Sequence, residues 1–154
     1  VHMMQLPLRR TTFAEVASAR RRIHDYLAEK PGDVDFNDAA ALQVDLGILR
    51  REELQEKMDI LDTECHILRL GTVAFATNPF ELFLDFGNQI KARSYAEQTF
   101  LVQLAGGSEG YLPTEKAEKG GHYSAFLASG LVGHAGGEQL VRETLKNINK
   151  LFAE

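Results

Sequence analysis

The stretch TVAFATNPFELFLDFGNQIKARSYAEQTFLVQLA, residues 72–105, decides the fold class of this 154-residue chain. Its first part, 72–78, is short and rich in apolar and β-branched residues, which is typical of a strand. Its last part, 98–105, is almost continuously hydrophobic and predicts a strand covered on both faces. The middle, 79–94, has the spacing of a helix, with apolar residues at Phe80, Phe83, Leu84 and Ile90 and a glycine at Gly87. This order predicts a strand–helix–strand crossover unit with parallel strands, for which the right-handed connection is the default.

The segments on either side extend this unit. CHILRL, 65–70, lies before it and is separated from it by Gly71, so the two apolar runs predict two strands or one bent strand. After it, 123–130 could form another strand, and 137–152 has the apolar periodicity of a final helix. We therefore expect 64–154 to be an α/β (or α+β) unit, a small mixed sheet with flanking helices.

The chain before residue 64 has a different character. Residues 11–30 predict a helix that begins with the capping box Thr12-x-x-Glu15, and 36–60 predicts one or two more helices. The segment 11–63 is thus expected to be helical. Because Val1-His2-Met3 looks like a cloning remnant, 1–10 is interpreted as a tag remnant and lead-in.

Composition excludes several classes of protein. The formal charge of -5 argues against a dedicated nucleic-acid binder, and the arginines at 20–22 suit a solvated helix face. The single cysteine, Cys65, excludes an intrachain disulfide and is expected to be a small buried side chain. No run of 18 apolar residues predicts a membrane span, and no signal sequence is visible. Together these features lean towards a cytoplasmic protein.

Glu81 is the first residue that could carry chemistry. One interpretation is structural: Asn78 caps the helix, Pro79 takes its first position, and Glu81 closes a capping box. The other is functional, because a helix that follows a strand begins at the strand's C-terminal edge, where α/β proteins build their sites. A carboxylate at that edge could ligate a metal.

Tyr111 is the second candidate, in the glycine-rich stretch GGSEGYLPT, residues 106–114. Its ring could simply pack under a turn. The stretch also follows the 98–105 strand and should return to the same sheet edge as Glu81, and its glycines permit unusual backbone dihedrals. The histidines offer less: His66, His122 and His134 are expected to be structural, since no pair has the spacing of a helical metal site.

Several motifs together resemble the neutral/alkaline non-lysosomal ceramidase family, with the greatest similarity to its uncharacterised bacterial members. They are Pro79-Phe80-Glu81, the buried run at 99–104, Gly110-Tyr111-Leu112-Pro113-Thr114 and the later Tyr123, in that order. The resemblance covers about 64–152. This sequence has Phe80 where the family usually has glycine, and Ser124 where an acidic residue often follows the later tyrosine. The family's C-terminal immunoglobulin-like domain has no counterpart here.

The resemblance implies a zinc-dependent amide hydrolase whose zinc site uses two histidines, a glutamate and a tyrosine. By motif position, Glu81 and Tyr111 match the glutamate and the tyrosine of the metal site; Tyr111 would either ligate the metal or act as a catalytic residue that donates a hydrogen bond to the developing oxyanion. The two histidines belong to an upstream part of the family's domain. We therefore expect a C-terminal fragment that contributes part of a zinc site, partners the upstream part of the same protein, and is inactive alone towards an amide or lipid-like substrate.

Two other functions fit the residues. The helices of 11–60 could form an interaction module that makes a homo-oligomer or docks on another domain. Alternatively, the strand ends could bind a small ligand without a metal.

Overall fold

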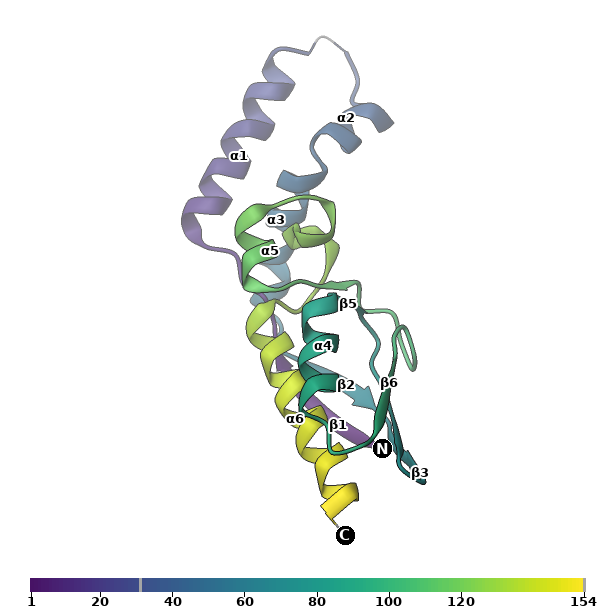
Figure 1. Cartoon of the computed structure of the whole chain (residues 1–154). Helices are drawn as coiled ribbons and strands as arrows, with labels where there is room; N and C mark the ends of the chain where they lie inside the picture. The colour runs from purple at the N-terminus through teal and green to yellow at the C-terminus, as the bar shows by residue number, and fades with distance from the viewer. Residues whose placement is uncertain (31, 154) are drawn as a thin grey trace.

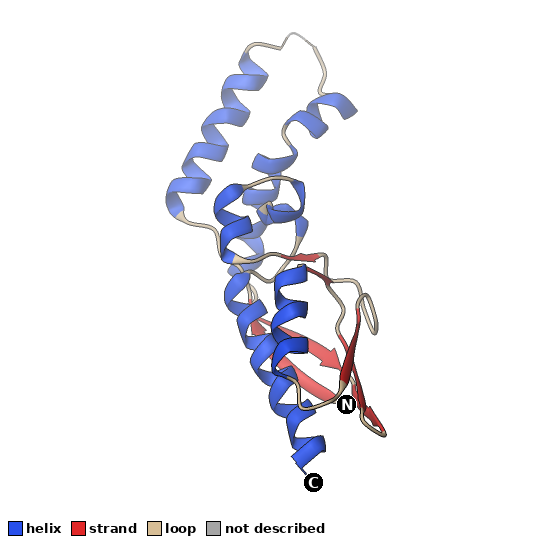
Figure 2. Ribbon diagram, viewed as in Figure 1, coloured by secondary structure: helices blue, strands red, loops and turns tan. Residues whose placement is uncertain are grey.

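The computed structural model describes residues 1–30 and 32–153, and it confirms the predicted α/β or α+β class, with helices and small mixed sheets. The chain is elongated: a helical arm occupies one end, and the sheets and the long C-terminal helix occupy the other (Figures 1 and 2). The segments that carry Glu81 and Tyr111 lie between these two ends.

The crossover unit is present. Strands β3 (Ile67–Leu70), β4 (Val73–Thr77) and β6 (Gln98–Val102) form a sheet in the order β3-β4-β6. Strands β3 and β4 are antiparallel around the left-handed turn at Gly71 (φ 62°), whereas β4 and β6 are parallel and connected through helix α4 (Leu84–Arg93). The prediction of two parallel strands joined by a helix is confirmed.

One face of this sheet is covered by α4 and by the last helix, α6 (His134–Ala153). The core between them contains Ala74 and Ala76 from β4 and Phe86 and Ile90 from α4. Helix α6 begins three residues before the expected 137. Its Gly137 lies against the Phe86 ring, so that a Cβ there would collide with the ring.

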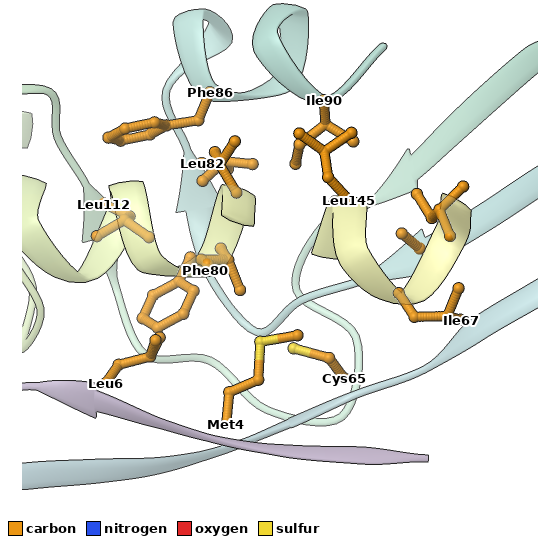
Figure 3. Packing of buried hydrophobic residues seen from close by; sticks show 14 of the residues in the cluster. Met4, Leu6, Cys65, Ile67, Phe80, Leu82, Phe86, Ile90, Leu112 and Leu145 are labelled. Atoms are coloured by element: carbon orange, nitrogen blue, oxygen red, sulfur yellow. The ribbon is translucent and has the colours of Figure 1, made fainter. Parts of the chain in front are cut away.

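A second sheet pairs the N-terminus with the strand before β3. Strand β1 (His2–Pro7) runs antiparallel to β2 (Ile60–Cys65). Figure 3 shows Met4 and Leu6 meeting Cys65 and Phe80 in one cluster. The first residues, expected to be a lead-in, therefore supply core side chains, and the helical segment expected to reach residue 63 gives way to strand at residue 60.

Two further expectations are wrong. The helix predicted over 79–94 begins only at Leu84, because residues 81–82 form strand β5 (Glu81–Leu82) and Phe83 is the N-cap. The strand predicted over 123–130 is instead two short 3-10 helices, η1 (Tyr123–Ala125) and η2 (Leu127–Ser129). At 81–82 a hydrogen bond to distant backbone overrides the local pattern, whereas 123–129 forms local turns in which Ala125 N donates to His122 O and Ser129 N donates to Phe126 O. Glu81 N donates to Gly110 O, and Gly130 makes an isolated bridge to Gly110.

The N-terminal helices agree with their sequence signals. They are α1 (Phe13–Ala28), capped by Thr12 and Glu15 in a complete capping box, α2 (Phe36–Ala41) and α3 (Gln43–Gln55). Arg20 and Arg22 on α1 are exposed and pair with Glu52 and Asp45 on α3. The two helices share a small core with η2, formed by Val16, Ala19, Ile48 and Leu127.

Asp38 predicts a pH dependence for the tip of the arm. Its carboxylate accepts hydrogen bonds from Asp35 N (2.7 Å), from Lys30 Nζ and from Tyr26 (3.0 Å). These contacts lower its pKa from 3.8 to about 2, and the Asp35 N–H has the largest effect, followed by Lys30. Because the folded pKa is depressed, the stabilisation is present above the unfolded pKa and is lost as pH falls from about 4 to 2.

We expect the thermal unfolding midpoint of the wild type, measured by circular dichroism, to fall as the pH is lowered from about 4 to 2. The fall should be smaller in Asp38→Asn, whose side chain does not titrate. Asp25→Asn, on the exposed side of α1, is the matched control. Its unfolding midpoint should depend on pH in the same way as that of the wild type. Identical pH profiles for Asp38→Asn and the wild type would contradict this assignment.

Candidate functional site

Glu81 and Tyr111 lie side by side. Strand β5 pairs in parallel with β7 (Tyr111–Leu112), and the register places Glu81 directly opposite Tyr111. Glu81 N donates to Gly110 O (3.0 Å) and Phe83 N donates to Leu112 O (3.2 Å), which fixes that register. Directly paired residues project from the same face of a sheet, so both side chains point to one side. The sequence-based expectation that the two residues meet at one edge is thus realised in the backbone.

The two side chains also interact chemically. A hydrogen bond with the Glu81 carboxylate is the largest of the causes that raise the pKa of Tyr111, followed by burial and then by the negative charge of Glu81. Tyr111 consequently keeps its proton at neutral pH and acts as the donor. Both residues are half-buried. Because Glu81 lies in β5, outside α4, the helix-capping interpretation of this residue is wrong.

The glycine-rich turn brings Tyr111 back beside β5. Gly106 and Gly110 have positive φ angles of 80° and 76°, which a side chain would disfavour. Glu109 N then donates to Pro79 O (2.8 Å), so the returning chain is attached to the segment just before Glu81. The role proposed for these glycines from sequence, a turn at the sheet edge, agrees with their conformations.

Tyr123 lies beside Tyr111 and adds a second phenol to the Glu81–Tyr111 pair. Its ring meets the Tyr111 ring edge-on, with centroids 5.9 Å apart, and it is itself exposed on η1. The residue before it, His122, is exposed with φ 79°. The site is therefore an open surface with one carboxylate and two phenols.

The other candidate residues take structural roles. His66 pairs with Glu64 (2.8 Å) and His134 with Glu118 (2.8 Å), rather than with Glu81 or Tyr111. Cys65 is buried as predicted, and burial raises its thiol pKa to about 11. Within residues 1–30 and 32–153, no group of three or more His, Cys, Asp and Glu side chains is arranged to hold a metal ion.

A hollow of about 350 Å³ beside the start of α6 is a second place with polar side chains, including Arg9, Glu118 and His134. Glu118 accepts hydrogen bonds from His134 N (2.7 Å) and His134 Nδ1 (2.8 Å), and Arg9 Nε lies 3.8 Å away. Glu118 thus occupies the positive end of α6 as a built-in anion. This cap could not be predicted from local pattern, because Glu118 lies 16 residues before His134.

Arg51 is the polar residue that sequence reasoning overlooked most completely. It is only 5% exposed and donates to four backbone carbonyls, those of Arg9, Leu127, Gly130 and Leu131. Burial, and secondly the charge of Arg9, lower its pKa to about 10, so it remains a cation at neutral pH. One side chain therefore ties α3 to the segment behind the Glu81–Tyr111 pair, where Gly130 bridges Gly110.

Neither family models, curated proteins nor solved structures match this chain. Among the helices that the structure describes, none has the length and apolar character needed to cross a bilayer. Any function assigned to the chain therefore rests on its own residues and on the resemblance of its motifs.

Proposed function

We propose that this chain is the C-terminal part of a ceramidase-like, zinc-dependent amide hydrolase and contributes Glu81 and Tyr111 to the metal site. The observation that carries the proposal is the parallel pairing of β5 with β7, which sets a carboxylate and a phenol directly opposite each other on one side. These two side chains come from segments 30 positions apart in sequence, yet both are half-buried and the strand register sets them directly opposite each other. They are the two residues that the family motifs single out.

The pair fits half of a zinc site. A carboxylate oxygen and a phenol oxygen are both possible zinc ligands, but a tetrahedral site needs further donors, and imidazoles bind zinc well. The proposal assigns those imidazoles to the upstream part of the same protein. By itself, this chain is expected to bind zinc weakly and to hydrolyse no amide.

Zinc bound at this place would lower the pKa of a water molecule and polarise the amide carbonyl of the substrate. Glu81 would supply negative charge to the metal. Tyr111 has its pKa raised, so its hydroxyl stays protonated at neutral pH and can donate a hydrogen bond to the oxyanion that develops from the carbonyl. The edge contact with Tyr123 restricts the position of the Tyr111 ring.

The test is made in the full-length hydrolase. We expect Glu81→Gln to lower bound zinc per protein molecule, measured by metal analysis after dialysis, because the site loses its only anionic ligand from this chain. Tyr111→Phe should lower kcat for amide hydrolysis by about 10²–10³-fold, the loss typical of removing one oxyanion donor.

Matched controls are available in the same chain. Glu109→Gln lies in the same turn, and its main-chain bond to Pro79 O survives the change; Tyr95→Phe alters an exposed tyrosine at the other end of α4. Both should keep full zinc and activity. Unchanged zinc content and activity in a Glu81→Ala/Tyr111→Ala double variant would remove the proposed site.

One observation favours a second function, an interaction module. The helical arm exposes large apolar side chains at Phe13, Val34 and Phe36, as a helix that meets a partner would. Concentration-dependent self-association that Phe13→Ser and Phe36→Ser abolish, together with indifference of the biological activity to Glu81 and Tyr111, would favour this function over the hydrolase.

A further inference from the structure

The β3-β4-β6 sheet has an apolar outer face. Helices α4 and α6 pack on its inner face, whereas the outer face exposes Leu68 (60%) and Leu70 (72%) on β3 and Phe100 and Val102 (42% each) on β6. The half-buried Phe75 of β4 lies between these strands. We call this set of five side chains the outer sheet face.

The outer sheet face is continuous across the three strands. In the register, Leu68 pairs with Phe75 and Phe75 pairs with Phe100, so the three side chains form one row. The Phe75 and Phe100 rings are stacked with centroids 5.1 Å apart. A sheet face that meets water normally carries polar residues in alternation with the core positions. Apart from Thr77 and Gln98 at the two ends of its rows, this face has the composition of a sheet that is covered on both sides.

The exposed area helps to identify what covers it. From the exposed fractions we place the apolar area at roughly 400 Å², comparable to the largest apolar patch of an ordinary monomer. A stable interface between separate molecules buries about 1,600 Å² in total, about 800 Å² on each partner. Interfaces between parts of one chain are smaller, roughly 600–1,500 Å². A covalently linked partner needs less contact area, because its effective concentration is in the millimolar range for a short linker. The area therefore favours a linked segment over a second copy.

The position of the outer sheet face points to the same occupant. Its Val102 end adjoins the segment that leads to the site: Asn78 N donates to Val102 O (3.0 Å), and Glu81 follows three residues later. A body seated on this face therefore lies next to the Glu81–Tyr111 pair. In the proposed hydrolase, the upstream part must reach that pair to supply its two imidazoles.

We infer that the outer sheet face is the docking surface for the upstream part of the same protein, which covers Leu68, Phe75 and Phe100 with an apolar face of its own. This inference rests on the proposed function, since that proposal supplies the upstream part. Sheets and helices that pack on a sheet in this way exclude water from the interface and fix the orientation of the partner. The docking would thereby position the missing metal ligands.

The test uses the full-length protein with a benzophenone amino acid at position 68, and the cross-linked peptides are identified by mass spectrometry. We expect a cross-link within one molecule to a peptide upstream of this chain. Position 34 at the tip of the helical arm, as exposed as position 68 (60%) and at the other end of the molecule, gives the background yield. A cross-link between two copies, or a yield at position 68 no higher than background, would overturn the inference.

A double variant, Leu68→Asp/Leu70→Asp, whose side chains are 60% and 72% exposed, gives an independent readout. In the isolated chain its unfolding midpoint should stay that of the wild type, because both side chains are exposed there. In the full-length protein, protease should now cleave the boundary between the two parts at least tenfold faster. An unchanged cleavage rate would count against docking at this face.

The outcomes separate the two proposals. An intramolecular cross-link from position 68, combined with zinc content that Glu81→Gln and Tyr111→Phe leave unchanged, would retain the docking surface and reject the zinc site. Zinc content that depends on Glu81, combined with no cross-link above background, would retain the site and reject the docking surface.

Discussion

Replacing Arg51 with methionine is expected to lower the free energy of unfolding by about 3–5 kcal/mol, as when one partner of a buried charged network is removed. The methionine fills similar space but leaves the carbonyls of Arg9, Leu127 and Gly130 without the donor that now satisfies them. Each buried acceptor left unpaired costs roughly 1–3 kcal/mol. Urea unfolding followed by circular dichroism measures the loss.

Arg50→Met is the control, because it makes the same chemical change one position earlier, on the exposed side of α3. It should change stability by less than about 0.5 kcal/mol, as surface substitutions usually do. Arg51→Lys should lie between the two, since a lysine ammonium keeps the charge but cannot reproduce the planar guanidinium's contacts with several carbonyls. Equal stabilities for Arg50→Met and Arg51→Met would show that the carbonyl contacts contribute nothing.

The parts of the fold that the sequence predicts well are those with local causes. Thr12 and Glu15 form their capping box from neighbouring residues, and Gly71 makes its turn alone. Helix α6 follows its own apolar periodicity. The crossover unit is equally local, because a strand, a helix and a strand of these lengths have few other ways to pack.

The predictions that failed depend on distant partners. Asn78-Pro79-Phe80-Glu81 has the local pattern of a helix start, yet Phe80 is fully buried in the core and Glu81 pairs with Tyr111, 30 positions away. The 98–105 run was expected to be covered on both faces, but only its inner face is covered within the described chain, and the strand ends at Val102. Local spacing carries no information about such contacts.

The candidate site likewise has features that could be predicted from the sequence and features that could not. That Glu81 and Tyr111 share an edge follows from the order of strands and turns, and could be predicted. That they face one another in register depends on the main-chain bonds from Glu81 to Gly110 and from Phe83 to Leu112. Behind this pairing, Gly130 bridges Gly110 and accepts a hydrogen bond from Arg51. Arg51 has no motif around it, so its role could not be recognised before the fold was known.

Gly110→Ala is expected to disrupt the site and to lower stability by about 3 kcal/mol, combining backbone strain with overpacking. Gly110 has φ 76°, and a Cβ there would lie closer than 3.0 Å to the carbonyl oxygen of Ser129, which is backbone and cannot rotate away. To relieve the collision, β7 must move and carry Tyr111 away from Glu81. The pKa of Tyr111, raised first of all by its hydrogen bond to Glu81, should then fall towards its ordinary value of 10. An ultraviolet titration of tyrosinate, read as a difference from the Tyr111→Phe variant, measures this fall.

Gly106→Ala separates the two causes, because Gly106 has a similar φ of 80° but open space where its Cβ would be. This control includes the left-handed strain, roughly 1–2 kcal/mol, without the collision. Gly106→Ala should therefore lower stability modestly and leave the pKa of Tyr111 as raised as it is in the wild type. If Gly110→Ala lost no more stability than Gly106→Ala and kept the raised Tyr111 pKa, the close approach to Ser129 would have no part in holding Tyr111 beside Glu81. The backbone strain is common to both variants, whereas only Gly110→Ala adds the collision with Ser129. A larger loss of stability in Gly110→Ala than in Gly106→Ala, together with a lowered Tyr111 pKa, would therefore mean that the close approach of the Gly110 and Ser129 backbones aligns Glu81 with Tyr111.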